Sequence, residues 1–278
     1  NSLGWQIAGT RESLTGIPRP DFLEYVGQHY RGDKMVISVA GKLPKDVLGK
    51  IEKYFGSVKG DKKALLAGTK SKNEGVRYGF EQFKVTQEKP RVKLHYKDTE
   101  QVQLALGVTT YAMTDPKNQP LSLMSIILGG NMSSRLFIQV RERRGLAYHV
   151  RASVNNYQDI GSLTIQAGLD KARLNDAIKV ILDQVALMRD KGITDEELTK
   201  AKNFLKGKMI LDLEDTSALA VWYNRQELLK NEILTPEEKM VKIMAVTKAD
   251  IKKVAVEVLD EKRLNMALIG PYKDSAAF

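Results

Sequence analysis

Apolar and polar residues alternate in several segments after Arg91, as they do in strands with one buried face. The alternating apolar positions are Val92, Leu94 and Tyr96, followed by Val102, Leu104, Leu106 and Val108. The same alternation over Tyr148 to Asn155 and over Ser162 to Gly168, on either side of a polar turn, predicts a hairpin. The apolar run from Leu264 to Ile269 predicts a closing strand.

Helical spacing dominates the intervals between these strands. A helix is predicted over Pro120 to Leu128 and a second over Ser133 to Arg143, with Gly145 placed to cap it. One helical stripe consists of Leu174, Ile178, Ile181, Val185 and Met188. Start signals for three later helices are Thr194 with Glu197, Thr235 with Pro236, and Thr247 with Asp250. This order of elements predicts an α+β fold, an antiparallel-rich sheet with helices on one face.

The first 58 residues carry a shorter pattern of the same kind. A helix is predicted over Pro20 to Tyr30, a buried strand over Met35 to Ala40, and a helix over Leu43 to Tyr54. Residues 59–90 are rich in Lys, Gly, Gln and Glu and have little periodicity, which is typical of a linker. We therefore expect a partial domain over residues 1–58, a linker over residues 59–90 and a complete domain over residues 91–278.

One segment occurs twice without a gap. Asp21 to Gly41 matches Asp250 to Gly270, shifted by 229 positions, and each copy reads as a helix, a charged turn, an apolar strand and a closing Gly. Only 20 residues precede the first copy, whereas 159 residues run from Arg91 to the second. The repeat predicts two similar α+β sandwich domains, of which the first is truncated at its front.

Composition narrows the class of protein. With 42% apolar and 28% charged residues among 278, the chain is typical of a soluble globular protein, and no apolar run is long enough to span a membrane. The absence of cysteine excludes disulfides and thiolate-bound metal. The net charge of +10 comes from scattered Lys and Arg interleaved with acidic residues, which argues against nucleic acid and favours a surface attractive to acidic peptides.

The sequence offers few candidates for chemistry. His29, His95 and His149 are far apart and belong to no metal-binding motif, and there is no phosphate-binding loop or nucleophile elbow. Arg141 near a helix end and Tyr148 just beyond the following turn could together donate hydrogen bonds to a carbonyl or a developing oxyanion. Equally, an Arg in a last helical turn complements the helix dipole, and a Tyr that opens a strand is a packing residue.

The segment Gly129 to Tyr148, GGNMSSRLFIQVRERRGLAY, resembles the second-half motif of the pitrilysin/insulinase family of zinc metallopeptidases, which includes the mitochondrial processing peptidases and bacterial homologues. The opening segment, Leu3 to Ser13, resembles a family segment that follows the zinc-binding region. The resemblance covers nearly the whole chain and implies that residues 1–58 are the C-terminal remainder of a zinc-bearing type of domain and that residues 91–278 are a substrate-binding domain. Because the two halves of that family share one fold, it also accounts for the repeat.

The resemblance implies roles for individual residues. The family's substrate-binding Arg and Tyr, seven positions apart, match Arg141 and Tyr148, which would hold the substrate backbone and polarise the scissile carbonyl. The family's inverted H-x-x-E-H motif and its downstream Glu ligand precede the segment with which this chain begins, so zinc is expected in the full-length enzyme and no metal on this chain. Gly129 and Gly130 are expected to form a tight turn. Structural or solvated roles are expected for Arg135, Arg143 and Arg144.

Three functions fit this resemblance. The chain is the C-terminal part of a zinc metalloendopeptidase and inactive alone, or a non-catalytic subunit of a two-subunit peptidase, or a structural or binding homologue. The implied partners are a peptide or protein substrate and either the missing N-terminal half or a homologous subunit, in a homo- or heterodimer. Neither nucleic acid nor a membrane is expected, and the compartment is cytoplasmic or periplasmic if the source is bacterial.

Overall fold

The computed structural model describes residues 4–58, 60, 83–230 and 232–274. The chain forms two compact units, Asn1–Gly79 with Leu219–Asn231, and Phe80–Ala218 with Glu232–Phe278. The expected linker, residues 59–90, lies mostly outside the described residues, so the predicted domain boundaries stay predictions. The contribution of Leu219–Asn231 to the first unit is a non-local contact that the sequence pattern does not predict.

The second unit is built on a five-stranded sheet in the order β1-β5-β2-β4-β3. The strands are β1 (Arg91–Tyr96), β2 (Gln101–Thr110), β3 (Ala147–Asn156), β4 (Gly161–Asp170) and β5 (Asn265–Gly270). β1 runs parallel to β5, and the other three neighbouring pairs are antiparallel. These strands confirm the predicted hairpin, the predicted closing strand and the predicted antiparallel-rich sheet.

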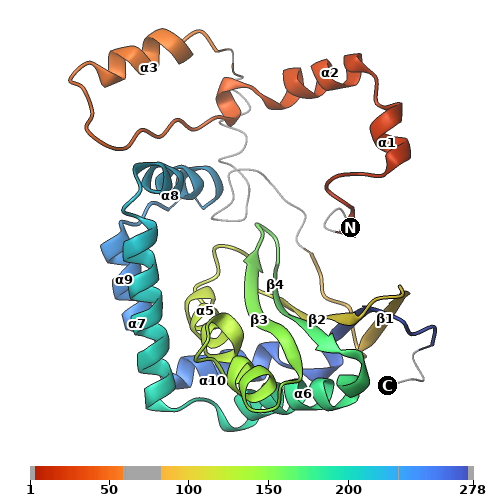
Figure 1. Cartoon of the computed structure of the whole chain (residues 1–278). Coiled ribbons are helices and arrows are strands. Elements are labelled where there is room, and N and C mark those ends of the chain that lie inside the picture. The colour runs from red at the N-terminus through yellow and green to blue at the C-terminus, as the bar shows by residue number, and fades with distance from the viewer. Residues whose placement is uncertain (1–3, 59, 61–82, 231, 275–278) are drawn as a thin grey trace. The chain divides into compact units, whose positions relative to one another are not determined.

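Helices cover one face of this sheet. The long helices of the second unit are α5 (Asn118–Ser125), α6 (Leu174–Lys191), α7 (Asp195–Asp212), α9 (Pro236–Met244) and α10 (Lys248–Val258). α5, α6 and α10 lie on the same side of the sheet (Figure 1). The β2 and β4 side chains that point to this side are buried, among them Val102, Leu104, Leu106, Leu163, Ile165 and Leu169. The predicted α+β class is therefore confirmed, with the core between sheet and helices.

Helix starts follow the predicted capping residues. Thr194, Thr235 and Thr247 each accept a hydrogen bond from the backbone three residues later, and each is part of a complete capping box. Such a box satisfies two backbone N–H groups that a helix start would otherwise leave without partners. α8 (Thr216–Leu229) has its first residues in the second unit and the remainder in the first.

The first unit is helical in the residues described. It contains α1 (Arg11–Gly16), α2 (Arg19–His29), the short 3-10 helix η2 (Gly32–Lys34) and α3 (Val47–Phe55), which confirm the two predicted helices. The prediction of a buried strand over Met35 to Ala40 is wrong: that segment has no regular secondary structure and is partly exposed. The reason is that no neighbouring strand pairs with it among the described residues, although Asn224 donates a hydrogen bond to the carbonyl of Val36 at 2.8 Å.

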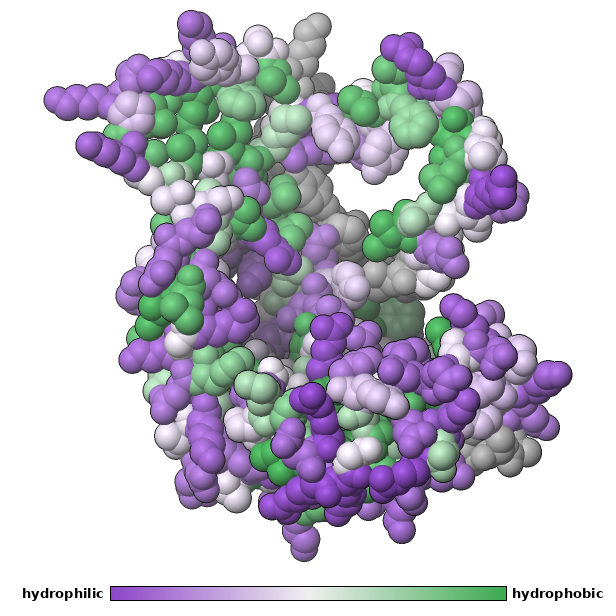
Figure 2. Space-filling view, in the orientation of Figure 1, coloured by the Kyte–Doolittle hydropathy of each residue, from purple (hydrophilic) through white to green (hydrophobic). Residues whose placement is uncertain are grey.

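The repeat predicted from the sequence is present in the local structure. α2 and α10 begin and end 229 positions apart, and so do η2 and the 3-10 helix η6 (Glu261–Arg263). Only the second copy continues into a strand, β5. Apolar residues are exposed throughout the first unit, and hydrophobic colours gather over its α1–α3 segments in Figure 2.

Candidate functional site

Arg141 lies on a π-helical turn, η4 (Phe137–Glu142). The N–H of Arg143 donates to the carbonyl of Ile138 at 2.9 Å, the five-residue step that defines a π-helix. A second π-helical segment, η3 (Ile126–Gly130), precedes it. The sequence predicts ordinary helices here, and π-helical turns are rare features that often occur at functional sites.

The Arg141 side chain is exposed and rests on an aromatic ring. Its guanidinium carbon lies 4.9 Å from the centre of the Phe137 ring, a cation–π contact between residues four apart. No carboxylate among the described residues forms an ion pair with Arg141. The sequence analysis did not single out Phe137, although its spacing of four from Arg141 could have indicated the contact. The contact positions the guanidinium and leaves its charge available.

A short turn connects Arg141 to the strand that carries Tyr148. The N–H of Gly145 donates to the carbonyl of Arg141 at 3.0 Å, and the N–H of Leu146 donates to the carbonyl of Val140 at 2.9 Å. Gly145 has a φ of 57°, in the left-handed region, which confirms its predicted capping position. Leu146 is buried in the core. The end of η4 and the start of β3 are therefore fixed relative to each other.

Tyr148 is the extra residue of a β-bulge. Ala147 pairs with Leu169 and His149 pairs with Gly168, so the register between β3 and β4 shifts across Tyr148. Bulges re-aim side chains and are frequent beside active sites. Here Ala147 is buried and Tyr148 is 60% exposed at the edge of the sheet.

Arg135 has a structural role. Its Nε lies 2.5 Å from Oε1 of Glu197, and its Nη2 donates to Oε2 of Glu197 at 2.7 Å and to the carbonyl of Gly192 at 2.8 Å. Burial alone would raise the pKa of Glu197, but the hydrogen bonds from Arg135 and Thr194 outweigh it and hold that pKa below its ordinary value. The ion pair ties the segment before η4 to the start of α7.

The other residues of the motif are either structural or exposed to solvent. Arg144 donates to the backbone and side-chain oxygens of Gln139, and Arg143 is exposed. The backbone leaves the helical conformation at Gly129, where the expected turn occurs. A Cβ at Gly129 would lie 2.5 Å from the N of Ala152, so Gly129 also allows η3 to approach β3 closely.

The described residues do not fit a zinc site. His29 lies in the first unit, whereas His95 and His149 lie on β1 and β3, the two edges of the sheet. Across the described ranges, no group of three or more His, Cys, Asp or Glu is placed to hold a metal ion. In the same ranges, no helix combines the length and the apolar character needed to cross a membrane.

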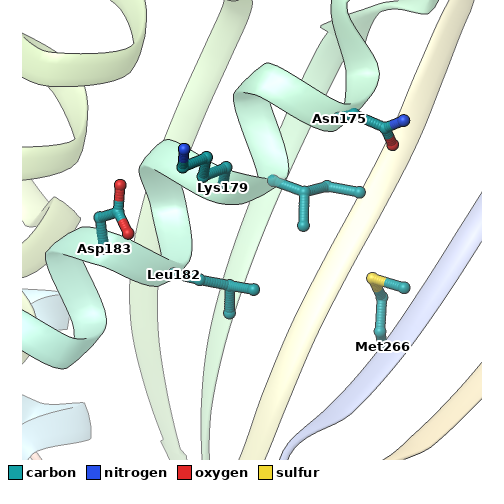
Figure 3. Close-up of a pocket in the computed structure, with 6 residues that line it drawn as sticks. Asn175, Lys179, Leu182, Asp183 and Met266 are labelled. Atoms are coloured by element: carbon teal, nitrogen blue, oxygen red, sulfur yellow. The ribbon is translucent and has the colours of Figure 1, made fainter.

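The second unit also contains two apolar hollows. The first, of about 400 Å³, lies between α6 and β5, where Leu182 extends toward Met266 (Figure 3). The second, of about 410 Å³, shares Leu182 and Asp183 with the first and continues toward Leu106 and Leu259. Neither hollow is lined by Arg141 or Tyr148, which are both exposed.

Comparison with known sequences finds one matching family model and relatives that are named as zinc proteases. Residues 16–205 match the family model described as the peptidase M16 inactive domain. The chain is 33% identical over 98% of its length to YmxG, an uncharacterized zinc protease of Bacillus subtilis, of which it covers 62%. It is 30% identical over its whole length to an uncharacterized zinc protease of Streptomyces coelicolor, of which it covers 59%. The chain thus spans about three fifths of these relatives.

Solved structures share the fold. A protease from Helicobacter pylori superposes with a TM-score of 0.82 at 19% identity, covering 95% of this chain and 62% of that one. A peptidase M16 inactive domain from Pseudomonas fluorescens superposes with a TM-score of 0.64 at 24% identity, covering 70% of this chain and 46% of that one. Because the family model matches well over half of the chain, this protein belongs to the M16 peptidase family, through the domain described as inactive.

Proposed function

We propose that this chain is the substrate-binding part of a zinc metalloendopeptidase, in which Arg141 and Tyr148 hold the peptide backbone at the scissile carbonyl. The observation that carries the proposal is the turn between the π-helical segment η4 and the β-bulge. It exposes one permanently charged donor and one neutral phenol within eight residues of fixed backbone. That the relatives are named zinc proteases supports the reaction class.

The two side chains have complementary tasks. The guanidinium of Arg141 presents several N–H donors in a plane and can hold two backbone oxygens of an extended peptide. The phenol of Tyr148 donates a single hydrogen bond to the carbonyl oxygen as negative charge develops there. Because the described residues offer no metal site, we assign zinc, and the water that it activates, to a part of the full-length protein outside this chain.

Substitution in the full-length protein tests these roles. We expect Arg141→Ala to lower kcat/KM for peptide cleavage about 10²–10³-fold, and Tyr148→Phe to lower it by a similar factor or less. Arg143→Ala is the matched control, since Arg143 is also exposed and lies two residues away. Cleavage by Arg141→Ala at the same rate as by Arg143→Ala would contradict the proposed role.

The zinc-bearing part is either in the same polypeptide or in a homologous subunit, as a homo- or heterodimer. The Arg141–Tyr148 turn fits both arrangements. The protein isolated from its source distinguishes them by intact mass and N-terminal sequencing under denaturing conditions. One polypeptide that carries both an H-x-x-E-H motif and this chain supports the first arrangement, and two homologous polypeptides support the second.

A further inference from the structure

The sheet of the second unit has a second face, opposite α5, α6 and α10, which we call the open face. Strand register aligns its side chains in rows across the strands. The first row is His95, Ile269, Gln103, Gly168 and His149, and the second is Lys93, Ala267, Ala105, Gln166 and Arg151. Most of these residues are exposed, in contrast to the buried side chains on the helix face.

The side chains of the open face carry more positive than negative charge. Basic residues lie at both edges, Lys93 on β1 and Arg151 on β3, and the strands between them contribute small or neutral side chains. The five strands contain a single carboxylate, that of Asp170 at the end of β4. It accepts a hydrogen bond from the N–H of Ala172 at 2.9 Å and caps the helix that follows. Lys93 and Arg151 therefore outnumber the one carboxylate that the five strands contain.

Arg151 is held in place by a neutral partner. Its Nε and Nη2 both donate to Oε1 of Gln166 on the neighbouring strand, at 3.1 and 2.8 Å. The Gln166 amide fixes the orientation of the guanidinium without cancelling its charge, and the remaining N–H donors are open to a ligand. A donor that is already oriented loses less side-chain entropy on binding.

His149 is also fixed against the sheet, beside the proposed site. A Cβ on Gly168 would lie 2.5 Å from Cε1 of His149, so the imidazole occupies space that only glycine leaves free. His149 follows Tyr148 directly, and Arg151 lies about 7 Å further along β3, at roughly 3.4 Å for each residue. A peptide held at Tyr148 would reach Arg151 within a few of its own residues, and its next residues could cross the strands toward Lys93.

We propose that the open face binds an extended acidic segment of the substrate, with Arg151 as its main contact and Lys93 at the far edge. That the face selects substrates rests on the proposed peptidase function. Binding of an acidic peptide to the face does not require that function. Four strand spacings of about 4.8 Å separate Lys93 from Arg151, or about 19 Å, which some six extended residues span. The aliphatic and small residues between them suit a peptide, because nucleic-acid sheets usually carry aromatic stacking residues.

Binding of labelled peptides to the 278-residue chain tests the proposal without catalysis. Three peptides share one sequence except at four positions, which are all Glu in the first peptide, all Gln in the second and all Lys in the third. By fluorescence anisotropy at low salt, we expect the Glu peptide to bind about tenfold more tightly than the Gln peptide, and the Lys peptide to bind most weakly. The preference should shrink at high salt, because the contacts are exposed.

Matched variants locate the contact. Arg151→Gln should remove most of the preference for the Glu peptide, whereas Lys206→Gln, the same loss of charge at an exposed position on α7, should leave it unchanged. Far-UV circular dichroism checks that both variants are folded. Equal affinity for the Glu and Gln peptides, equal effects of the two variants, no detectable binding, or preferential binding of a single-stranded oligonucleotide would each overturn the proposal.

This binding assay, together with the cleavage assay of the full-length protein, separates this proposal from the peptidase function. If Arg141→Ala weakens the binding of all three peptides equally and Arg151→Gln leaves their affinities unchanged, the backbone-binding role of Arg141 stands and the open-face proposal is wrong. If Arg151→Gln removes the acidic preference and Arg141→Ala has no effect on binding or on cleavage, the open face binds acidic peptides and the proposed role of Arg141 is wrong.

Discussion

The two copies of the repeated segment share their local structure and differ in their surroundings. In the second copy, Ile251 and Val254 of α10 are at most 2% exposed. In the first copy, Phe22 and Tyr25 occupy the equivalent positions of α2 and are each 59% exposed. The helix and the 3-10 turn are therefore encoded locally, whereas burial depends on the elements that lie alongside.

Strand formation shows the same dependence. β5 lies between β1 and β2, so its backbone groups have partners on both sides. Met35 to Ala40 has no such partners among the described residues and forms no strand, and Ile37 and Val39 are left exposed. An extended apolar segment becomes a strand only when neighbouring strands satisfy its N–H and C=O groups.

The largest difference in stability is expected when proline is introduced at equivalent positions of the two copies, one in β5 and one in residues 35–40. Ala267→Pro should destabilise the second unit by on the order of 3 kcal/mol, because it removes a ladder hydrogen bond inside the sheet. Ser38→Pro, 229 positions earlier, should change stability by less than about 1 kcal/mol. Urea unfolding followed by far-UV circular dichroism measures both.

Two probes keep the units apart in this experiment. Trp5 and Trp222 both belong to the first unit, so tryptophan fluorescence reports on it selectively. Ala267→Pro should leave the fluorescence transition in place. A loss of similar size from Ser38→Pro in this chain would show that residues 35–40 are paired, and would remove the contrast.

The sequence predicted the elements better than their pairing. Alternation over Val102 to Val108 and the capping pair Thr247–Asp250 are local signals, and the corresponding elements are confirmed. The buried strand over Met35 to Ala40 failed because pairing is non-local. In the site, the spacing of Arg141 and Tyr148 was readable from the motif, and their roles stay predictions.

Other features of the site were not readable from the sequence. The bulge at Tyr148 depends on the register of β3 against β4, and the π-helical turn of η4 depends on how the helix ends against the core. The rows that place Lys93 and Arg151 on one face also need the order of all five strands. Non-adjacent strands cannot be aligned from periodicity alone.

A smaller contrast is expected for equivalent helix positions. Ile251→Ala should cost about 2–4 kcal/mol, since it removes a fully buried side chain and leaves a cavity. Phe22→Ala, at the equivalent exposed position, should stay within about 0.5–1 kcal/mol. The midpoint of urea unfolding measures the first by circular dichroism and the second by tryptophan fluorescence. Equal losses would mean that α2 is as well packed as α10.

The smallest contrast concerns the helix starts. Thr247 caps α10 and forms a capping box with Asp250, whereas Pro18 at the start of α2 has no capping side chain. Thr247→Ala should therefore cost about 1 kcal/mol, and Pro18→Ala should cost less. Urea unfolding measures both, and equal costs would mean that the Thr247 cap contributes nothing beyond the change of residue.

The dependence of the cap on pH gives a second readout. Hydrogen bonds from the Thr247 side chain and then from its backbone N–H hold the pKa of Asp250 below its ordinary value of 3.8. A lowered folded-state pKa stabilises the protein above the unfolded pKa, and this stabilisation is lost as the pH falls through the lowered value. The cost of Thr247→Ala, measured by urea unfolding, should thus be larger at about pH 7 than at about pH 2. A cost that does not change with pH would assign the cap to the Thr247 side chain alone, without the Asp250 carboxylate.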